Sequence, residues 1–306
     1  MYKYKLSVVV CTYKRENLLS ICLNSLENQT AVKSDYEIVV VNNYSNGLSD
    51  GLIKEFTNKF DNIRFINEPN QGLSHARNRG WKESSGRYVA FIDDDSKAEK
   101  DWCKIIISSF EKVKPKPISV GGKYLPWYKV TPPYWFHDKI VILSWGDKAK
   151  YLVPPSAQYG FGGSNMAFDR YAFELIGGFS TEYGMIGNEL RLGEETEFFM
   201  RLYKTHPRFW YDPQLIIYDF IPPKNMEIRY LLRRSYKSGQ TLRNMVGCSY
   251  LSRTNFTKLM ILIYTLFKLP FRLIKKSETL FAEIILFIME FSHYIGFIIG
   301  RNDQNL

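Results

Sequence analysis

The chain has 306 residues, of which 45% are hydrophobic and 24% are charged, and its formal net charge is +10. This length and composition exclude an intrinsically disordered chain, and they are sufficient for one large domain with or without an appended segment. The four cysteines form no CxxC pair and show no zinc-finger spacing, so we expect reduced thiols rather than disulfides or a zinc site.

Short apolar runs alternate with segments of helical periodicity in the first part of the chain. The runs are rich in β-branched residues, as in strands buried on both faces, and the segments between them carry apolar residues at helical spacing. This alternation predicts an α/β fold with a Rossmann-like, mostly parallel doubly wound sheet, in which ligands bind beyond the carboxyl ends of the strands. The predicted strands are Leu6–Cys11, Tyr36–Asn42, Ile63–Asn67 and Tyr88–Ile92, and the predicted helices are Glu16–Glu27, Leu52–Lys59 and Leu73–Glu83.

The second part of the chain is less regular. A further strand is predicted at Ile118–Tyr124, and the segment after it, Leu125–Gly163, is dense in Pro, Trp and Tyr. Its length is unusual for a plain connection, which indicates a functional loop or lid. Because Pro222 and Pro223 cannot continue a regular element, we predict one domain over residues 1–221 and a separate helical tail over 222–306. Regular elements are predicted at Ser164–Phe168, Tyr171–Ile176, Glu194–Lys204 and Leu215–Tyr218.

The tail from residue 220 onward is basic and apolar, with thirteen Lys or Arg against five Asp or Glu. Leu259–Phe267 is too short to span a bilayer, and Leu280–Gly300 is long enough but is interrupted by two glutamates and a histidine. We therefore expect amphipathic helices that lie on an anionic membrane surface, and a cytoplasmic protein without a secretory signal, peripheral at the inner face of the membrane. The alternatives are a packed helical subdomain and a dimer interface. Nucleic acid is not expected as a partner, because the basic residues are interleaved with aliphatic runs.

Three consecutive aspartates, Asp93, Asp94 and Asp95, follow the fourth predicted strand. Adjacent carboxylates repel one another and resist burial unless a cation is present. If the strand continued, Asp93 and Asp95 would project to the same side, where Mg²⁺ or Mn²⁺ would be a suitable partner for oxygen ligands and substrate phosphates. The alternative is a solvated acidic turn.

Four stretches, in this order, resemble the family-2 glycosyltransferases of the GT-A fold. They read SVVVCTYKRENLLSICLNSLENQT, EIVVVNNYSNGLSDG, NEPNQGLSHARNRGWKESSGRYVAFIDDDS, and GGSNMAFDRYAFELIGGF followed by GEETEFFMRL. Each fragment is a weak signal alone, but the ordered set is specific. The resemblance implies that residues 1–221 form a GT-A catalytic domain that takes a sugar from a nucleotide-diphosphate donor, with metal dependence and inversion of configuration.

The resemblance also assigns the nucleotide end of the site. Thr12 and Tyr13 fall where the family contacts the base and ribose, and Asn42 falls where the family usually has an aspartate that binds the base. An amide can accept a hydrogen bond from a uracil N–H and can also donate one. Arg77 falls on the family arginine near the nucleotide and diphosphate, where a planar guanidinium can grip phosphate through two bonds.

The same resemblance assigns the metal. Asp93 and Asp95 match the family's DxD pair, with the first near the ribose and the last on Mn²⁺ or Mg²⁺, and Asp94 between them is included in the nucleotide-sugar site. Asp219 stands where many members carry a metal-ligating histidine, and its carboxylate is a competent hard-oxygen ligand. A plain surface residue is the alternative for Asp219.

Glu194 and Glu195 begin a predicted helix, where carboxylates are also favoured by the helix dipole. The family has Glu-Asp at this place, and the second acid is the catalytic base of inverting members. Glu195 is therefore expected to be the base, although its extra methylene leaves Glu194 as the other candidate.

The expected reaction is transfer of the sugar to a hydroxyl of a glycan or lipid-linked acceptor in cell-surface polysaccharide synthesis, with a UDP-sugar as the favoured donor. The aromatic side chains of residues 125–163 could stack on acceptor sugars, or they could simply fill the core. A nucleotidyltransferase and a catalytically inactive nucleotide-sugar-binding membrane module are the alternatives. These aromatic residues are Trp127, Tyr128, Tyr134, Trp135 and Trp145.

Overall fold

The computed structural model describes residues 2–44, 47–154, 159–187, 189–247, 260 and 280–299. The chain divides into two compact units. The second unit takes up two internal segments that the sequence placed with the first domain. The first unit consists of Met1–Leu125, Leu143–Glu189 and Glu194–Phe220, and the second of Pro126–Ile142, Leu190–Gly193 and Ile221–Leu306.

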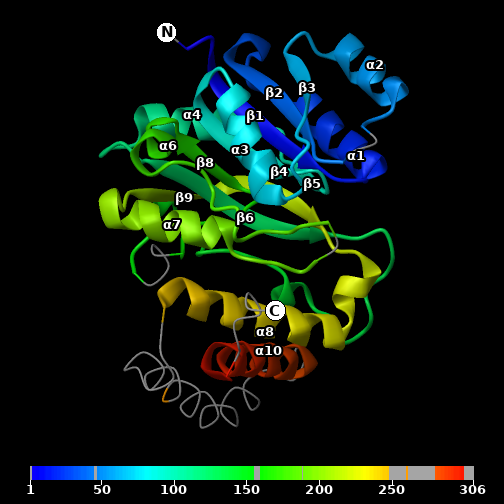
Figure 1. Ribbon diagram of the computed structural model, residues 1–306, viewed down its shortest axis with the longest axis vertical. Coiled ribbons are helices and arrows are strands. Elements are labelled where there is room, and N and C mark those ends of the chain that lie inside the picture. The colour runs from blue at the N-terminus through cyan, green and yellow to red at the C-terminus, as the bar shows by residue number, and fades with distance from the viewer. Residues whose placement is uncertain are drawn as a thin grey trace. The chain divides into compact units, whose positions relative to one another are not determined.

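A nine-stranded mixed sheet forms the centre of the first unit, with the order β3-β2-β1-β4-β8-β6-β9-β5 and with β7 paired to β9. The first four strands in this order are parallel, whereas β8 runs antiparallel to β4 and to β6. The expected α/β sheet is thus confirmed, and antiparallel strands extend it (Figure 1). The strands are β1 (Tyr4–Thr12), β2 (Tyr36–Asn42), β3 (Ile63–Asn67), β4 (Gly86–Asp93), β5 (Ser96–Ala98), β6 (Ser119–Trp127), β7 (Lys150–Tyr151), β8 (Met166–Asp169) and β9 (Phe209–Phe220).

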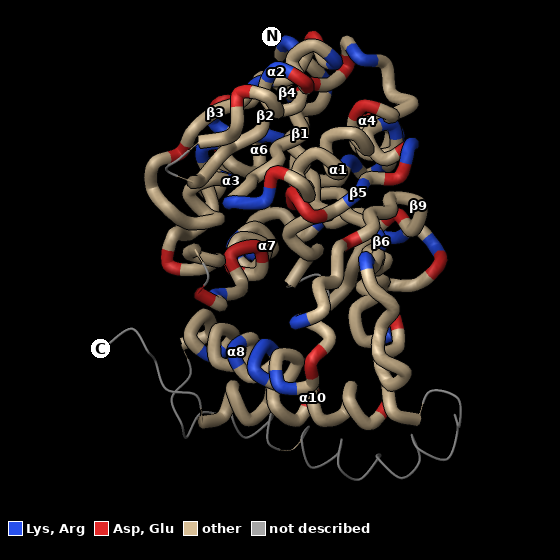
Figure 2. The backbone as a smooth tube through the Cα atoms, turned by 90° about the vertical axis from the view of Figure 1, so that its right-hand side faces the viewer, with Lys and Arg blue, Asp and Glu red and all other residues tan. Residues whose placement is uncertain are grey.

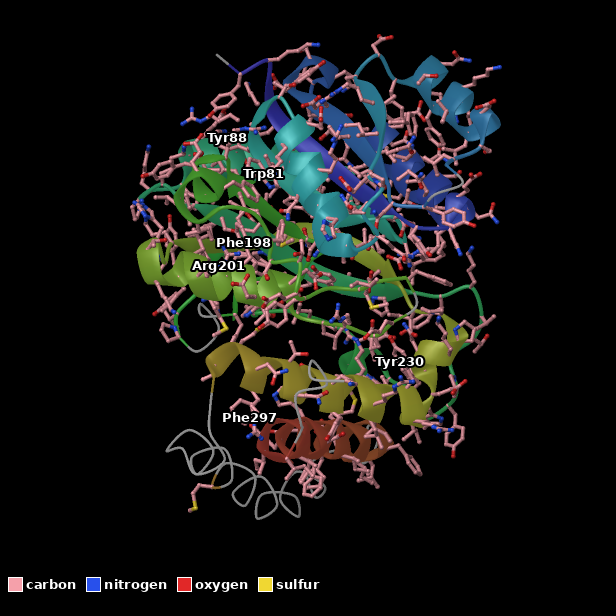
Figure 3. The ribbon with its side chains drawn as sticks, in the orientation of Figure 1. Trp81, Tyr88, Phe198, Arg201, Tyr230 and Phe297 are labelled. Carbon is pink, nitrogen blue, oxygen red and sulfur yellow. The ribbon has the colours of Figure 1, made fainter. Side chains whose placement is uncertain are left out.

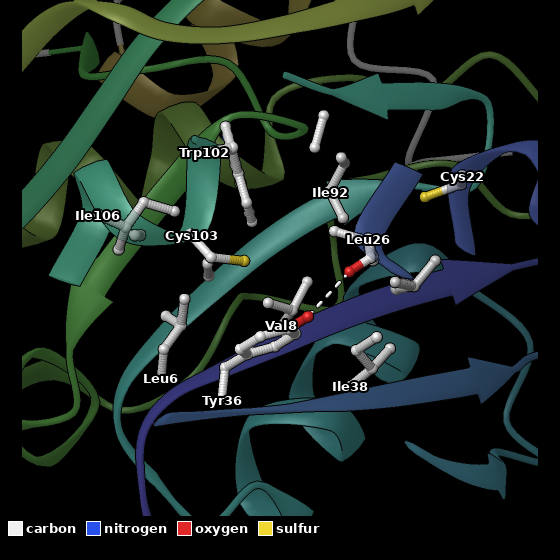
Figure 4. Close-up of a cluster of buried hydrophobic side chains, with 14 of the residues drawn as sticks. Leu6, Val8, Cys22, Leu26, Tyr36, Ile38, Ile92, Trp102, Cys103 and Ile106 are labelled. Atoms are coloured by element: carbon white, nitrogen blue, oxygen red, sulfur yellow. Dashed lines mark hydrogen bonds between the residues drawn. The ribbon is translucent and has the colours of Figure 1, made fainter. Parts of the chain in front are cut away.

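Helices cover both faces of this sheet because alternate strand residues point to opposite sides. Along β1, Leu6, Val8 and Val10 join one buried cluster with α1, α2 and α4, while Val9 and Cys11 join another with α3, α6 and α7. The first cluster includes the Tyr36 hydroxyl, which donates to the Leu26 carbonyl at 3.0 Å (Figure 4). The helices are α1 (Glu16–Glu27), α2 (Asp50–Lys59), α3 (Leu73–Glu83), α4 (Trp102–Lys112), α6 (Tyr171–Ile176) and α7 (Glu194–Thr205), with short 3₁₀ turns at Lys33–Asp35, Asp138–Ile140 and Pro223–Met226.

The second unit contains two packed helices, α8 (Ile228–Val246) and α10 (Leu280–Ile299), which lie side by side (Figures 1 and 2). They approach so closely that a Cβ at Gly239 would lie 1.9 Å from the His293 carbonyl oxygen, and one at Gly296 would lie 2.0 Å from that of Tyr236. Only glycine permits this crossing. Small residues at a helix crossing are found in soluble and membrane proteins alike.

The two helices differ in character. Five cationic side chains and no acidic ones lie within α8, whereas α10 is the single helix among the described residues that is long and apolar enough to cross a membrane by length and composition. That criterion alone is also met by buried core helices. Apart from Met260, the other apolar run of the tail, Leu259–Phe267, lies outside the described residues.

Candidate active site

The predicted nucleotide-sugar residues lie where the parallel strands end. Thr12 ends β1 and Asn42 ends β2 directly beside it, and Cys11 of β1 is paired with Asp93, the last residue of β4. Carboxyl ends of parallel strands meet at one edge of a sheet, so these positions share the edge at which such folds bind ligands.

The acidic triplet is a tight turn rather than a continuing strand. β4 ends at Asp93, and Asp94 and Asp95 form the turn before β5, so the alternation that would place Asp93 and Asp95 on one side does not extend to Asp95. Asp94 is fully buried and accepts a hydrogen bond from Thr12 Oγ1 at 2.7 Å. The guanidinium of Arg15 lies 2.7 Å from Asp94 Oδ1 and 2.5 Å from Asp95 Oδ2.

Burial has the largest effect on the pKa values of Asp94 and Asp95 in this turn. It raises the pKa of Asp94 to about 7, although the Arg15 charge and the Thr12 hydroxyl act in the opposite direction. It also raises the pKa of Asp95 against the same arginine. Asp94 Oδ1 is buried and has no hydrogen-bond donor of regular geometry among the described residues, so its compensation comes from the charge of Arg15 at 2.7 Å.

Arg77 is the buried cation of the site. Its Nη1 donates to Glu194 Oε1 at 2.5 Å and its Nη2 donates to Asp93 Oδ1 at 3.2 Å. Burial would lower the pKa of Arg77, but Glu194 and Asp93 outweigh burial and raise it. Gly163 leaves room for this side chain, because a Cβ there would lie 2.5 Å from Arg77 Nη2.

Two serines connect the triplet to Asp219. Ser164 Oγ accepts from the Asp93 backbone N–H at 2.9 Å and lies 2.8 Å from Ser96 Oγ, which in turn donates to Asp219 Oδ1 at 2.9 Å. Asp219 is on β9, opposite Ser96 of β5. Asp219 therefore belongs to the same polar network as Asp93, although 126 positions separate them in the sequence.

Helix α7 holds the two glutamates. Its buried side chains include Phe198, Phe199 and Leu202, and Arg201 binds Glu197 as well as the carbonyl oxygens of Ile176 and Gly178. Figure 3 shows Phe198 and Arg201 on this helix, with the Arg201 guanidinium centre 5.4 Å from the Phe198 ring centroid. These contacts hold the helix whose first turn contains Glu194 and Glu195.

Glu194 and Glu195 differ in their electrostatic surroundings. Glu194 is buried against Arg77, whereas burial and the charge of Glu194 raise the pKa of Glu195 to about 8 despite the opposing charge of Arg77. A carboxyl group with such a pKa accepts a proton in its deprotonated form, whose share of the population increases as the pH rises toward this pKa. Glu194 is thus ion-paired with Arg77, and Glu195 is the glutamate with the raised pKa.

Asn42 and Tyr13 are engaged in loop contacts. The Asn42 side chain donates to the Tyr44 carbonyl and to Asn67 Oδ1, and its Oδ1 accepts from the Tyr44 N–H at 3.2 Å. Tyr13 and Tyr44 pack edge to face at 5.4 Å, and the Tyr13 hydroxyl accepts from Gln71 Nε2 at 2.6 Å. Two tyrosine rings therefore stand at the ends of β1 and β2.

The donor set suits a hard divalent cation in type and charge. Carboxyl groups outnumber guanidinium groups in this network, and oxygen ligands are those that Mg²⁺ and Mn²⁺ prefer. Within the described ranges, however, no three His, Cys, Asp or Glu side chains are gathered as a ready metal cage. The six carboxyl groups are those of Asp93, Asp94, Asp95, Glu194, Glu195 and Asp219, and the two guanidinium groups are those of Arg15 and Arg77.

The aromatic side chains of residues 125–163 have varied surroundings. Trp145 packs edge-on to Phe161 and Tyr211 in the core of the first unit. In the second unit the Tyr128 hydroxyl donates to Asp138, and Tyr134 is 90% exposed with its ring 6.0 Å from that of Phe281.

The mixed sheet, with an acidic turn after β4 and a glutamate pair opening α7, is the architecture of GT-A glycosyltransferases. Residues 7–177 match the family model for glycosyl transferase family 2, which is more than half of the chain. The chain belongs to this family, and it is a glycosyltransferase. This confirms the resemblance and the enzyme class expected from the sequence, and it leaves the nucleotidyltransferase alternative without support.

Curated relatives agree with this assignment. The chain is 28% identical over 242 residues to the glucosyl-dolichyl phosphate glucuronosyltransferase of Haloferax volcanii, covering 79% of this chain and 77% of the relative. It is 24% identical to the succinoglycan biosynthesis protein ExoM of Rhizobium meliloti, covering 77% of this chain and 73% of the relative. Against glycosyltransferase GlyA of Streptococcus pneumoniae the identity is 38%, but the match covers 39% of this chain and only 17% of that longer relative.

Solved structures show the same fold. The mannosyltransferase PcManGT of Pyrobaculum calidifontis, in complex with GDP-Man and Mn²⁺, superposes with a TM-score of 0.58 at 17% identity, covering 81% of this chain and 66% of that one. S. aureus TarS 1–349 in complex with UDP superposes with a TM-score of 0.55 at 17% identity, covering 98% of this chain and 93% of that one.

Several site residues were not identified from the sequence. Arg15, Ser164 and Gly163 form direct contacts with the predicted residues, and Ser96 connects Asp219 to them. Arg15 could have been suspected, since it follows Thr12 closely after the first strand. The serines carry no such signal, because their partners are distant in sequence.

Proposed function

We propose that this glycosyltransferase moves a sugar from a nucleotide-diphosphate donor, with UDP-sugars favoured, to a hydroxyl of a glycan or lipid-linked acceptor with inversion at the anomeric carbon. The single observation that supports it most is the arrangement of the glutamate pair. Glu194 is paired with Arg77, while Glu195, with a pKa of about 8, is left as the proton acceptor beside the acidic turn.

In the proposed mechanism Glu195 accepts the proton of the acceptor hydroxyl as that oxygen attacks the anomeric carbon. The attack comes from the face opposite the leaving nucleoside diphosphate, which accounts for inversion. Arg77 orients both Glu194 and Asp93 from a buried position, so that the base and the acidic turn keep a fixed separation.

The donor end is formed by Thr12, Tyr13 and the acidic turn. Asp95, Asp93 and Asp219 would hold Mn²⁺ or Mg²⁺, which, when bound, neutralises charge on the departing diphosphate. The GDP-Man and Mn²⁺ complex of PcManGT and the UDP and UDP-GlcNAc complexes of TarS support a nucleotide-sugar donor and a divalent cation here.

The relatives and the second unit support the proposed acceptor and location. The relatives named above act on a glucosyl-dolichyl phosphate and in succinoglycan biosynthesis, which supports a lipid-linked or polysaccharide acceptor in cell-surface glycan synthesis. The cationic α8 (blue segments in Figure 2) and the apolar α10 support peripheral attachment to an anionic membrane at its cytoplasmic face. Cosedimentation with anionic and neutral liposomes tests this attachment, and equal binding to both would refute it.

The experiment for the proposed function is incubation with a panel of UDP-, GDP- and dTDP-sugars and Mn²⁺, followed by chromatography of the nucleotides. Release of a nucleoside diphosphate from one donor, absent with excess chelator, is the expected result. No release from any donor in the presence of membrane lipid extracts would contradict it.

A further inference from the structure

Arg15 is a charged side chain of the site to which the sequence and the family resemblance assign no role. It lies in the loop between β1 and α1, three residues after Thr12, and its side chain is 44% exposed. Despite this exposure, its guanidinium contacts two acidic side chains at once, Asp94 at 2.7 Å and Asp95 at 2.5 Å. A guanidinium with two carboxylates is a strong charge-assisted arrangement.

The two carboxylates that contact Arg15 differ in burial and in their other hydrogen bonds. Asp94 is fully buried and also tied to Thr12, whereas the Asp95 side chain is 19% exposed. Asp94 therefore anchors the arginine, and Asp95 is the partner that is open to solvent and to an incoming cation. Arg15 occupies the face of Asp95 with a positive charge.

The loop that carries Arg15 is under conformational strain. Lys14 has a φ of +59°, in the left-handed region that a residue with a Cβ rarely adopts, and it is the one non-glycine residue with positive φ in the described chain. Its ammonium lies 4.4 Å from the Tyr44 ring centroid and 5.2 Å from that of Tyr13. The loop is thus held in this shape by Arg15 at one end and by the tyrosine pair at the other.

We propose that Arg15 is a displaceable counter-cation: its guanidinium neutralises Asp94 and Asp95 while no divalent ion is bound, and it leaves Asp95 when one binds. This inference rests on the proposed function, which places the divalent ion at Asp95. The released guanidinium then faces the diphosphate of the donor, whose oxygens match its planar fork. Metal loading and the tyrosine-bearing loop are thereby coupled.

The test is calorimetric titration of the full chain with Mn²⁺ alone, and then with UDP in the presence of Mn²⁺. Arg15→Ala should bind Mn²⁺ about tenfold more tightly than wild type, because a competing cation is removed, and should bind UDP with Mn²⁺ about tenfold more weakly. Arg79→Ala is the matched control, since Arg79 is 43% exposed and pairs with Glu83 at 3.0 Å away from the site. Its two affinities should equal those of wild type.

A second variant guards against misfolding, because Arg15→Ala leaves the buried Asp94 charge without its cation. The double substitution Arg15→Ala with Asp94→Asn removes that charge and keeps the proposed metal ligands, so it should fold as judged by circular dichroism and still bind Mn²⁺ more tightly than Asp94→Asn alone. If loss of Arg15 leaves Mn²⁺ binding equal or weaker, the inference is wrong. The proposed function still holds in that case, provided that the wild-type protein transfers sugar. If wild type itself binds no Mn²⁺, the inference and the metal dependence in the proposed function both fail.

Discussion

Arg77 Nη1 donates to Glu194 Oε1 at 2.5 Å, joining helix α3 to the first turn of α7 across 117 residues of sequence. Both side chains are buried, with relative exposures of 1% and 5%. The Arg77 guanidinium also contacts Asp93 Oδ1 at 3.2 Å, so Glu194 is part of a buried charge network. This pairing supports the proposal that its neighbour, Glu195, is the base.

Replacing the two glutamates by glutamine separates their roles. Glu195→Gln should lower kcat by about 10²–10⁴, the usual contribution of a general base, while leaving donor affinity close to wild type. Glu194→Gln should retain measurable transfer and should lower the melting temperature instead. Steady-state kinetics with calorimetry of donor binding checks this, and loss of transfer in Glu194→Gln alone would reverse the assignment.

The pH dependence of kcat/KM reports the same group. Burial and the Glu194 charge raise the pKa of Glu195 to about 8, and a base is active only when deprotonated. Activity should therefore rise about tenfold per pH unit below this pKa and level off above it. Because the Glu194 charge raises the Glu195 pKa, Glu194→Gln should shift the rise in kcat/KM to lower pH. An unchanged pH profile would show that the Glu194 charge does not affect the titrating group.

Removing the buried cation should destabilise the first unit. Arg77→Met leaves Glu194 as an uncompensated buried charge, and breaking a buried pair in this way costs about 3–5 kcal/mol of unfolding free energy. Arg77→Met combined with Glu194→Met should recover much of that loss in urea unfolding. If Arg77→Met alone is as stable as wild type, the ion pair between Arg77 and Glu194 does not form in solution.

Asp95→Ala should abolish metal-stimulated transfer with the fold preserved. Asp95 lies in the turn after β4 and belongs to neither hydrophobic cluster of the first unit, so we expect the fold to survive its truncation. Turnover with and without Mn²⁺, together with thermal melting, checks both parts. Glu99→Ala, a nearby acidic residue outside the network of Asp93, should keep its Mn²⁺ dependence.

The close crossing of α8 and α10 makes Gly239 sensitive to substitution. Alanine is a better helix former than glycine by about 1 kcal/mol, yet Gly239→Ala should destabilise the second unit, because the new Cβ would lie 1.9 Å from the His293 carbonyl oxygen. Limited proteolysis should then release α10 faster. Arg234→Ala, at an exposed position of α8, is the control, and equal cleavage of both variants would argue against the packing.

Much of the fold could be predicted from local patterns. α1 and α3 have the bounds that apolar spacing predicted, the regular element predicted at Tyr171–Ile176 is α6, and β2 and β3 match their β-branched runs. β5 could not be found, because three residues carry no periodicity. β9 was predicted only over Leu215–Tyr218, since Asp212 and Pro213 interrupt its pattern, and it extends from Phe209 because pairing with β7 holds its first residues. α4 was overlooked although its apolar spacing is regular.

Local motifs in the sequence indicate candidate site residues but not the contacts between them. Strand ends and the family resemblance indicated Thr12, Asp93 and Glu195, because these belong to continuous motifs. No local pattern could indicate that Ser96 would join Asp219 across 123 residues, since that contact depends on the antiparallel pairing of β5 and β9. The metal ligands, the nucleotide contacts and the base remain predictions until tested.

The most direct test of the proposed mechanism is to follow the anomeric protons of donor and product by NMR during transfer, for wild type and for Glu195→Gln. We predict a product of inverted anomeric configuration, formed by wild type with release of nucleoside diphosphate and not formed by the variant. A product that retains the donor configuration, or undiminished transfer by Glu195→Gln, would contradict the mechanism.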